Sequence, residues 1–97
     1  MQTYPKFAHN PSLNMPYPLL FSPQRLGPIT LKNRAIVSSL TRASATQDGL
    51  VTPLMKSYYT DYGRGGWGMI ATEATYIDQK YSQGYSYQPG IANQQQA

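Results

Sequence analysis

The chain has 97 residues, of which 40% are hydrophobic, and a formal net charge of +4. Its Lys and Arg residues are scattered from Lys6 to Lys80 without a cluster, which argues against a nucleic-acid partner. The absence of Cys excludes disulfides, thiolate metal sites and cysteine nucleophiles. No apolar run approaches the roughly 18 residues of a membrane span, and no leader pattern is visible, so we expect a cytoplasmic protein without a membrane partner.

The N-terminal residues 1–19 are rich in Pro, Asn and Tyr, show no helical or alternating period, and are predicted to form an extended arm. They include His9, the only histidine. Because His9 has no neighbouring carboxylate, we interpret it as a surface residue and predict no metal site. From Leu20 to Leu31, two short apolar pieces flank Gly27-Pro28 and predict a hairpin-like turn.

A βαβ unit is predicted next. Arg34 to Leu40 is an apolar run that ends in hydroxylated and charged residues, as does Gly68 to Thr72, and such runs are typical of buried parallel strands whose C-terminal ends open onto a site. Thr52 before Pro53 predicts the start of a helix that reaches Tyr62. Two parallel strands and one helix cannot cover both faces of a sheet, so we expect a part of a larger α/β structure.

One face of the predicted helix carries apolar and aromatic residues, which we interpret as core packing rather than an aromatic cage. They are Leu54, Met55, Tyr58, Tyr59 and Tyr62, and the glycines at 63, 65 and 66 should end the helix.

The segment from Thr75 to Gly90 mixes Tyr with Ser, Gln and Gly, which fits either a long functional loop or an association-prone low-complexity stretch. Sequence alone leaves both alternatives open. Asn93 could cap a following helix.

Several short motifs, taken in order, resemble those of the old yellow enzyme family of FMN-dependent NAD(P)H oxidoreductases. Each motif alone is weak, but the ordered set from about Leu20 to Ile91 is specific. The motifs are Leu20-Phe21-Ser22-Pro23, Leu31-Lys32-Asn33-Arg34, Leu40-Thr41-Arg42, Asp48-Gly49, Tyr58-Tyr59, Thr72-Glu73-Ala74-Thr75 and Pro89-Gly90-Ile91.

The resemblance implies the N-terminal part of a TIM (β/α)8 barrel: a bottom hairpin, strand one, helix one, strand two and the following loop. Residues 20–97 would then be an incomplete FMN-binding domain that requires the remainder of the barrel. The complete enzyme would be an ene-reductase that transfers hydride from NAD(P)H through the flavin to an electron-poor alkene. No catalytic residue of the family maps within this chain.

The resemblance also assigns cofactor contacts to Ser39, Leu40, Thr41 and Ala74. Thr41 matches the residue that contacts the flavin carbonyl edge, and the small Ala74 would let its backbone N–H approach the ring. Ser39 is a departure, because Ser38-Ser39 stand where the family usually carries a small residue and proline.

Two charged residues, Arg42 and Glu73, follow the two predicted strands. A buried charge needs a partner, so we expect them to form a supporting ion pair rather than to act as acid and base.

Two other functions compete with the enzyme hypothesis. The chain could be a noncatalytic truncated fragment, or its Tyr- and Gln-rich stretch could serve nucleic-acid binding or association. The latter explains residues 75–96 but not the apolar strands.

Overall fold

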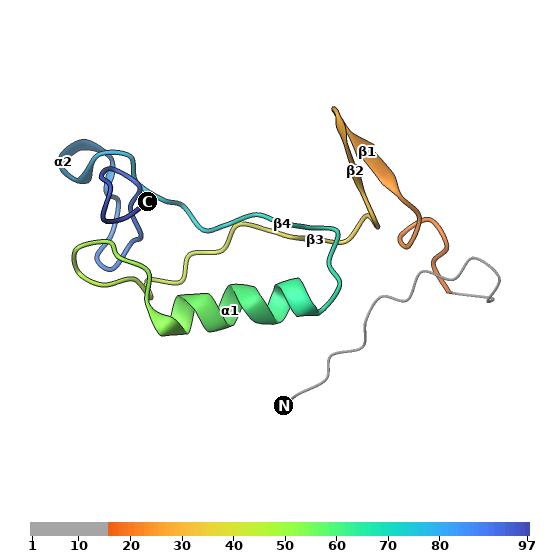
Figure 1. Ribbon diagram of the computed structural model, residues 1–97, viewed down its shortest axis with the longest axis horizontal. Helices are drawn as coiled ribbons and strands as arrows, with labels where there is room; N and C mark the ends of the chain where they lie inside the picture. The colour runs from red at the N-terminus through yellow and green to blue at the C-terminus, as the bar shows by residue number, and fades with distance from the viewer. Residues whose placement is uncertain (1–15) are drawn as a thin grey trace. The chain divides into compact units, whose positions relative to one another are not determined.

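The computed structural model describes residues 16–97, which divide into two compact units (Figure 1). The described part of the first unit comprises residues 16–37 and 61–71, and the second comprises 38–60 and 72–97. Most of the predicted N-terminal arm, including His9, lies outside the described residues. No helix of the described part is long and apolar enough to cross a membrane.

In the first unit, strands β1 (Gln24–Leu26) and β2 (Ile29–Leu31) form an antiparallel hairpin in which Leu26 pairs with Ile29. Gly27 adopts a φ of 58°, a left-handed conformation that glycine tolerates without steric cost and that suits a two-residue hairpin loop. The predicted hairpin around Gly27-Pro28 is therefore confirmed.

The first unit also contains the parallel pair β3 (Ile36–Val37) and β4 (Met69–Ile70), whose registers are Ile36 to Met69 and Val37 to Ile70. Figure 1 shows the two strands side by side. The parallel pairing is as predicted, but both strands are shorter than the sequence indicated. An apolar run predicts extended backbone, whereas a strand also requires a hydrogen-bonded partner along its whole length, and here the ladder ends at the Ala71 N–H bond to Val37 O, 2.9 Å long.

Asn33 and Gly68 hold the start of this ladder. Asn33 is 2% exposed; its Nδ2 donates to Gly66 O at 2.8 Å and its Oδ1 accepts from the Ala35 N–H at 3.0 Å. A Cβ on Gly68 would collide with the Asn33 main-chain oxygen, so only glycine fits where the strands approach.

Helix α1 (Pro53–Arg64) begins where the sequence predicted. The Thr52 hydroxyl oxygen accepts a hydrogen bond from the Met55 N–H at 3.2 Å, which confirms the N-cap. The helix ends at Arg64 rather than Tyr62, and the Gly65 N–H closes its last turn on Asp61 O at 3.0 Å.

The predicted core face of the helix is only partly correct. Met55 is 6% exposed, but Leu54 is 61% exposed. Successive helical residues point about 100° apart, so Leu54 and Met55 cannot share one narrow buried face.

The second unit contains a short helix, α2 (Gln79–Ser82), that the sequence analysis missed. Asp78 caps it by accepting from the Tyr81 N–H at 3.0 Å, a signal that was available in the sequence. The segment between Thr75 and Gly90 is closed at its ends by a parallel bridge from Tyr76 to Gly90, and the Tyr76 side chain is 1% exposed. It is therefore an ordered loop in this structure.

Two glycine substitutions should have opposite effects. We expect Gly68→Ala to destabilise the chain, because the new methyl group would push against the Asn33 main chain, while Gly63→Ala, on helix α1 with open space around its Cβ position, should stabilise it by about 0.5–1 kcal/mol. Urea unfolding of both variants measures this difference. Equal stability of the two variants would contradict the close approach of β3 and β4.

Candidate functional site

The candidate site comprises two segments of the second unit, residues 38–42 and 72–75, which follow β3 and β4 in the chain. The Ser39 hydroxyl donates to Thr72 O at 2.7 Å and ties the two segments together. Leu40 is 49% exposed and Thr41 is exposed. The apolar Leu40 side chain and the Thr41 hydroxyl are therefore accessible to a ligand.

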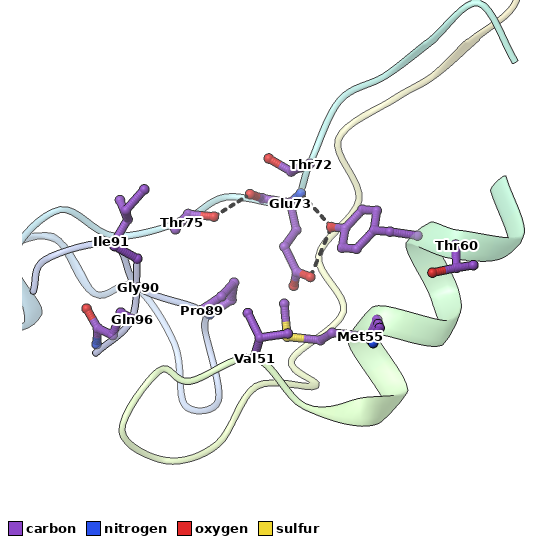
Figure 2. Close-up of a pocket in the computed structure, with 13 residues that line it drawn as sticks. Val51, Met55, Thr60, Thr72, Glu73, Thr75, Pro89, Gly90, Ile91 and Gln96 are labelled. Atoms are coloured by element: carbon purple, nitrogen blue, oxygen red, sulfur yellow. Dashed lines mark hydrogen bonds between the residues drawn. The ribbon is translucent and has the colours of Figure 1, made fainter. Parts of the chain in front are cut away.

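Tyr59 of α1 holds Glu73 through a pair of hydrogen bonds, marked by dashed lines in Figure 2. The Glu73 N–H donates to the Tyr59 hydroxyl oxygen at 2.9 Å, and the same hydroxyl donates to Glu73 Oε1 at 3.1 Å. Burial raises the pKa of the Tyr59 phenol above its ordinary value of 10.0, and the neighbouring Glu73 carboxylate acts in the same direction. Tyr59 thus stays neutral and can donate at physiological pH.

Ala74 presents a main-chain donor. Its carbonyl oxygen accepts from Gln88 Nε2 at 3.1 Å and from the Tyr85 hydroxyl at 3.4 Å. Its N–H has no acceptor among residues 16–97, and the residue is exposed. A small exposed residue with an available N–H can be approached closely by an acceptor atom.

The expected ion pair between Arg42 and Glu73 is not formed in this structure. The Arg42 guanidinium lies over the Tyr58 ring, 4.1 Å from its centroid, while Glu73 Oε1 is bonded to Tyr59. Arg42 is exposed and Glu73 is 3% exposed. By stacking on an aromatic face, the arginine keeps its contact with water and avoids the desolvation that pairing with a buried carboxylate would require.

A largely apolar cleft of about 440 Å³ lies beside Glu73 in the second unit (Figure 2). The second carboxylate oxygen of Glu73, Oε2, is buried and has no hydrogen-bond partner within the described part of the chain, residues 16–97. The walls of the cleft include Val51, Met55, Thr60, Pro89 and Ile91.

The structure brings Ser39 to Thr72 and Glu73 to Tyr59, whereas no hydrogen bond joins Thr41 to Ala74. The roles of Tyr59 and Gln88 were not predicted from the sequence. The helical period of the sequence predicts that Tyr59 faces inward, but it does not predict which main-chain group its hydroxyl will contact. Gln88 lies in a loop, where no periodic pattern predicts the direction of a side chain. Among residues 16–97, no group of three or more His, Asp or Glu side chains could hold a metal ion.

The amino-acid sequence is similar to those of known proteins. Residues 19–97 match the NADH:flavin oxidoreductase / NADH oxidase family. A chanoclavine-I aldehyde reductase of Penicillium roqueforti is 35% identical over 77 residues, which cover 79% of this chain and 21% of the relative. The chain thus spans about a fifth of the length of such curated relatives.

Solved structures give the same result. The old yellow enzyme homologue of Zymomonas mobilis is 42% identical, with a TM-score of 0.73 over 81% of this chain and 21% of that chain. Morphinone reductase is 37% identical, with a TM-score of 0.71 over 87% of this chain and 21% of that chain. The described residues therefore have the fold of the N-terminal part of the barrel in these proteins, although they contain no closed sheet themselves.

The raised pKa of Tyr59 predicts a pH-dependent stability. Below pH 10 the phenol is protonated in the folded and unfolded states, so Tyr59→Phe should cost about 1–3 kcal/mol for the lost hydrogen bonds. As the pH rises above 10, the unfolded state releases its proton first, and the stability that Tyr59 contributes should decrease until the pH passes the raised folded pKa.

Urea unfolding at a series of alkaline pH values measures the effect. Tyr81→Phe is the matched control, because it removes a hydroxyl from a side chain that is 79% exposed. A difference between wild type and Tyr59→Phe that does not change with pH would contradict the prediction.

The position of Arg42 can be tested by two double-mutant cycles. Arg42→Ala and Tyr58→Leu should show a coupling of about 0.5–1 kcal/mol, because the guanidinium stacks on that ring. Arg42→Ala and Glu73→Gln should be additive in the same denaturation assay. Coupling in the second cycle and additivity in the first would restore the ion pair expected from the sequence.

Proposed function

Because this chain belongs to the NADH:flavin oxidoreductase / NADH oxidase family, we propose that it supplies the N-terminal part of an FMN-dependent NAD(P)H oxidoreductase of the ene-reductase type. Bound FMN would supply the chemistry for hydride transfer from NAD(P)H to the β-carbon of an electron-poor alkene. The observation that carries the proposal is the Ala74 N–H, which belongs to an exposed residue, has no acceptor among residues 16–97, and lies on a main-chain segment held by side-chain hydrogen bonds.

The residues present fit a flavin at this place. An accepting atom of the flavin can approach the Ala74 N–H because the side chain is a single methyl group. The exposed Thr41 hydroxyl can donate a hydrogen bond to a flavin carbonyl, and a donor there favours negative charge on the reduced ring system. Half-exposed Leu40 offers apolar surface that a planar ring would cover.

Substrate and phosphate binding would come from other parts of the barrel. The site of an eight-stranded barrel is built from loops around its whole mouth, and this chain matches 21% of the length of the Zymomonas mobilis relative. We therefore propose that the 97 residues alone neither hold FMN tightly nor turn over NAD(P)H.

A chimaera tests the proposed function. Residues 19–97 of this chain would replace the matching N-terminal part of the Zymomonas mobilis old yellow enzyme homologue. We expect the chimaera to retain FMN through gel filtration and to show bleaching of its yellow absorbance by NADPH under anaerobic conditions, while the isolated chain retains no flavin. Ala74→Leu in the chimaera should weaken FMN binding about tenfold or more, because the larger side chain blocks access to the N–H.

Ala92→Leu is the matched control, since Ala92 is also exposed but lies outside the proposed contacts. A folded chimaera without flavin, or one in which both substitutions weaken binding equally, would refute the assignment of the site. An isolated chain that retains yellow flavin and is bleached by NADPH would refute the requirement for the remaining barrel.

A further inference from the structure

The main chain around Ala74 is held in an unusual way. Residues 72–74 follow β4 but belong to no strand, so no ladder of main-chain hydrogen bonds fixes them. Side chains take over this role: Thr72 O accepts from Ser39, the Glu73 N–H donates to Tyr59, Glu73 O accepts from Thr75 and Ala74 O accepts from Gln88.

These bonds leave one main-chain polar group of the segment available. Between Thr72 O and Ala74 O, every N–H and C=O has a side-chain partner within residues 16–97, except the Ala74 N–H. A loop held only by its chain ends would sample many conformations, and ordering it on ligand binding would cost conformational entropy. In this chain, residues 72–74 are already ordered by folding, before any ligand binds.

Tyr59 and Gln88 are themselves fixed. The Tyr59 hydroxyl is both acceptor and donor toward Glu73, so its orientation is set by two bonds. The Gln88 side chain is 4% exposed, and its Oε1 accepts from the Gly84 N–H at 2.7 Å while its Nε2 donates to Ala74 O. Tyr59 thus fixes the Thr72–Glu73 peptide and Gln88 fixes the Ala74–Thr75 peptide. These two peptides flank the Glu73–Ala74 peptide, which carries the Ala74 N–H.

We propose that Tyr59 and Gln88 are positioning residues that orient the Ala74 N–H toward an acceptor atom of the flavin. The inference rests on the proposed FMN site and deepens it, because neither side chain needs to touch the cofactor. Their effect passes through the main chain of residues 73 and 74, and a preorganised donor binds its acceptor with less loss of freedom than a mobile one.

The test uses the full 97-residue chain labelled with ¹⁵N and titrated with FMN to millimolar concentration, where weak binding is detectable by NMR. Without FMN, Tyr59→Phe should speed hydrogen exchange of the Glu73 amide about tenfold or more, since its acceptor is lost. With FMN, the shift of the Ala74 amide resonance should require roughly tenfold more ligand in Tyr59→Phe and in Gln88→Leu than in wild type.

Two variants serve as controls. Tyr81→Phe and Gln94→Leu make the same chemical changes at exposed positions and should behave as wild type. Unchanged exchange at Gly68 and Ala71, whose amides bond to Ala35 and Val37, verifies that each variant keeps the β3–β4 pairing.

The possible failures are distinguishable. If FMN shifts the Ala74 amide at the same concentrations in wild type, Tyr59→Phe and Gln88→Leu, the positioning role is overturned and the FMN site stands. If FMN leaves the Ala74 amide of the wild type unshifted while other amides respond, the contact at Ala74 is overturned together with the positioning role. If Tyr59→Phe disrupts the β3–β4 amides as well, Tyr59 is a general structural residue and the proposal fails.

Discussion

The Tyr59 hydroxyl is the interaction on which the candidate site depends. It accepts from the Glu73 N–H and donates to Glu73 Oε1, so a single oxygen atom fixes both the main chain and the side chain of one residue. The geometry follows from α1, which begins at the Thr52 cap and carries Tyr59 on its buried side two turns later. Residues 72–74 then need no strand partner, because side chains supply the bonds that a ladder would provide.

Burying the carboxylate of Glu73 costs free energy of folding. A carboxylate that is 3% exposed loses most of its hydration, and the bond from Tyr59 compensates at Oε1 only. Oε2 is buried beside an apolar cleft and has no hydrogen-bond partner among the residues that the structure describes. An all-hydrocarbon side chain would be cheaper to bury at this position, but it could not hold Tyr59 in the orientation that receives the Glu73 N–H. Glu73 therefore lowers the stability of the fold relative to an apolar residue, but it defines the main-chain geometry at this position.

Features that depend on local chemistry were predictable from the sequence. The Gly27-Pro28 turn and the Thr52 cap with Pro53 depend on residues close together in the chain. The parallel order of the two apolar runs followed from the helix between them, since a βαβ unit pairs its strands in parallel. The partners of Arg42 and Glu73 were not predictable in this way. Opposite charges at adjacent strand ends suggest an ion pair. In the structure, however, Arg42 stacks on the Tyr58 ring and Glu73 accepts a hydrogen bond from the Tyr59 hydroxyl, and both tyrosines come from α1. A sequence pattern predicts which side of its element a residue lies on. It does not predict which side chains of another element are available to contact that residue.

Ser39 stands where the resemblance described from the sequence implies a proline, and its hydroxyl supplies a different kind of restraint. Proline at this position would stiffen the backbone by fixing φ, and serine gives up that restriction. The Ser39 hydroxyl, however, donates to Thr72 O at 2.7 Å, a bond that a proline side chain cannot make. The restraint is therefore a hydrogen bond between two segments rather than a fixed φ within one segment. This hydrogen bond connects the residues that follow β3 with those that follow β4. Since Leu40, Thr41 and Ala74 lie within two residues of this link, the serine provides a direct mechanical connection between the two groups of proposed flavin contacts.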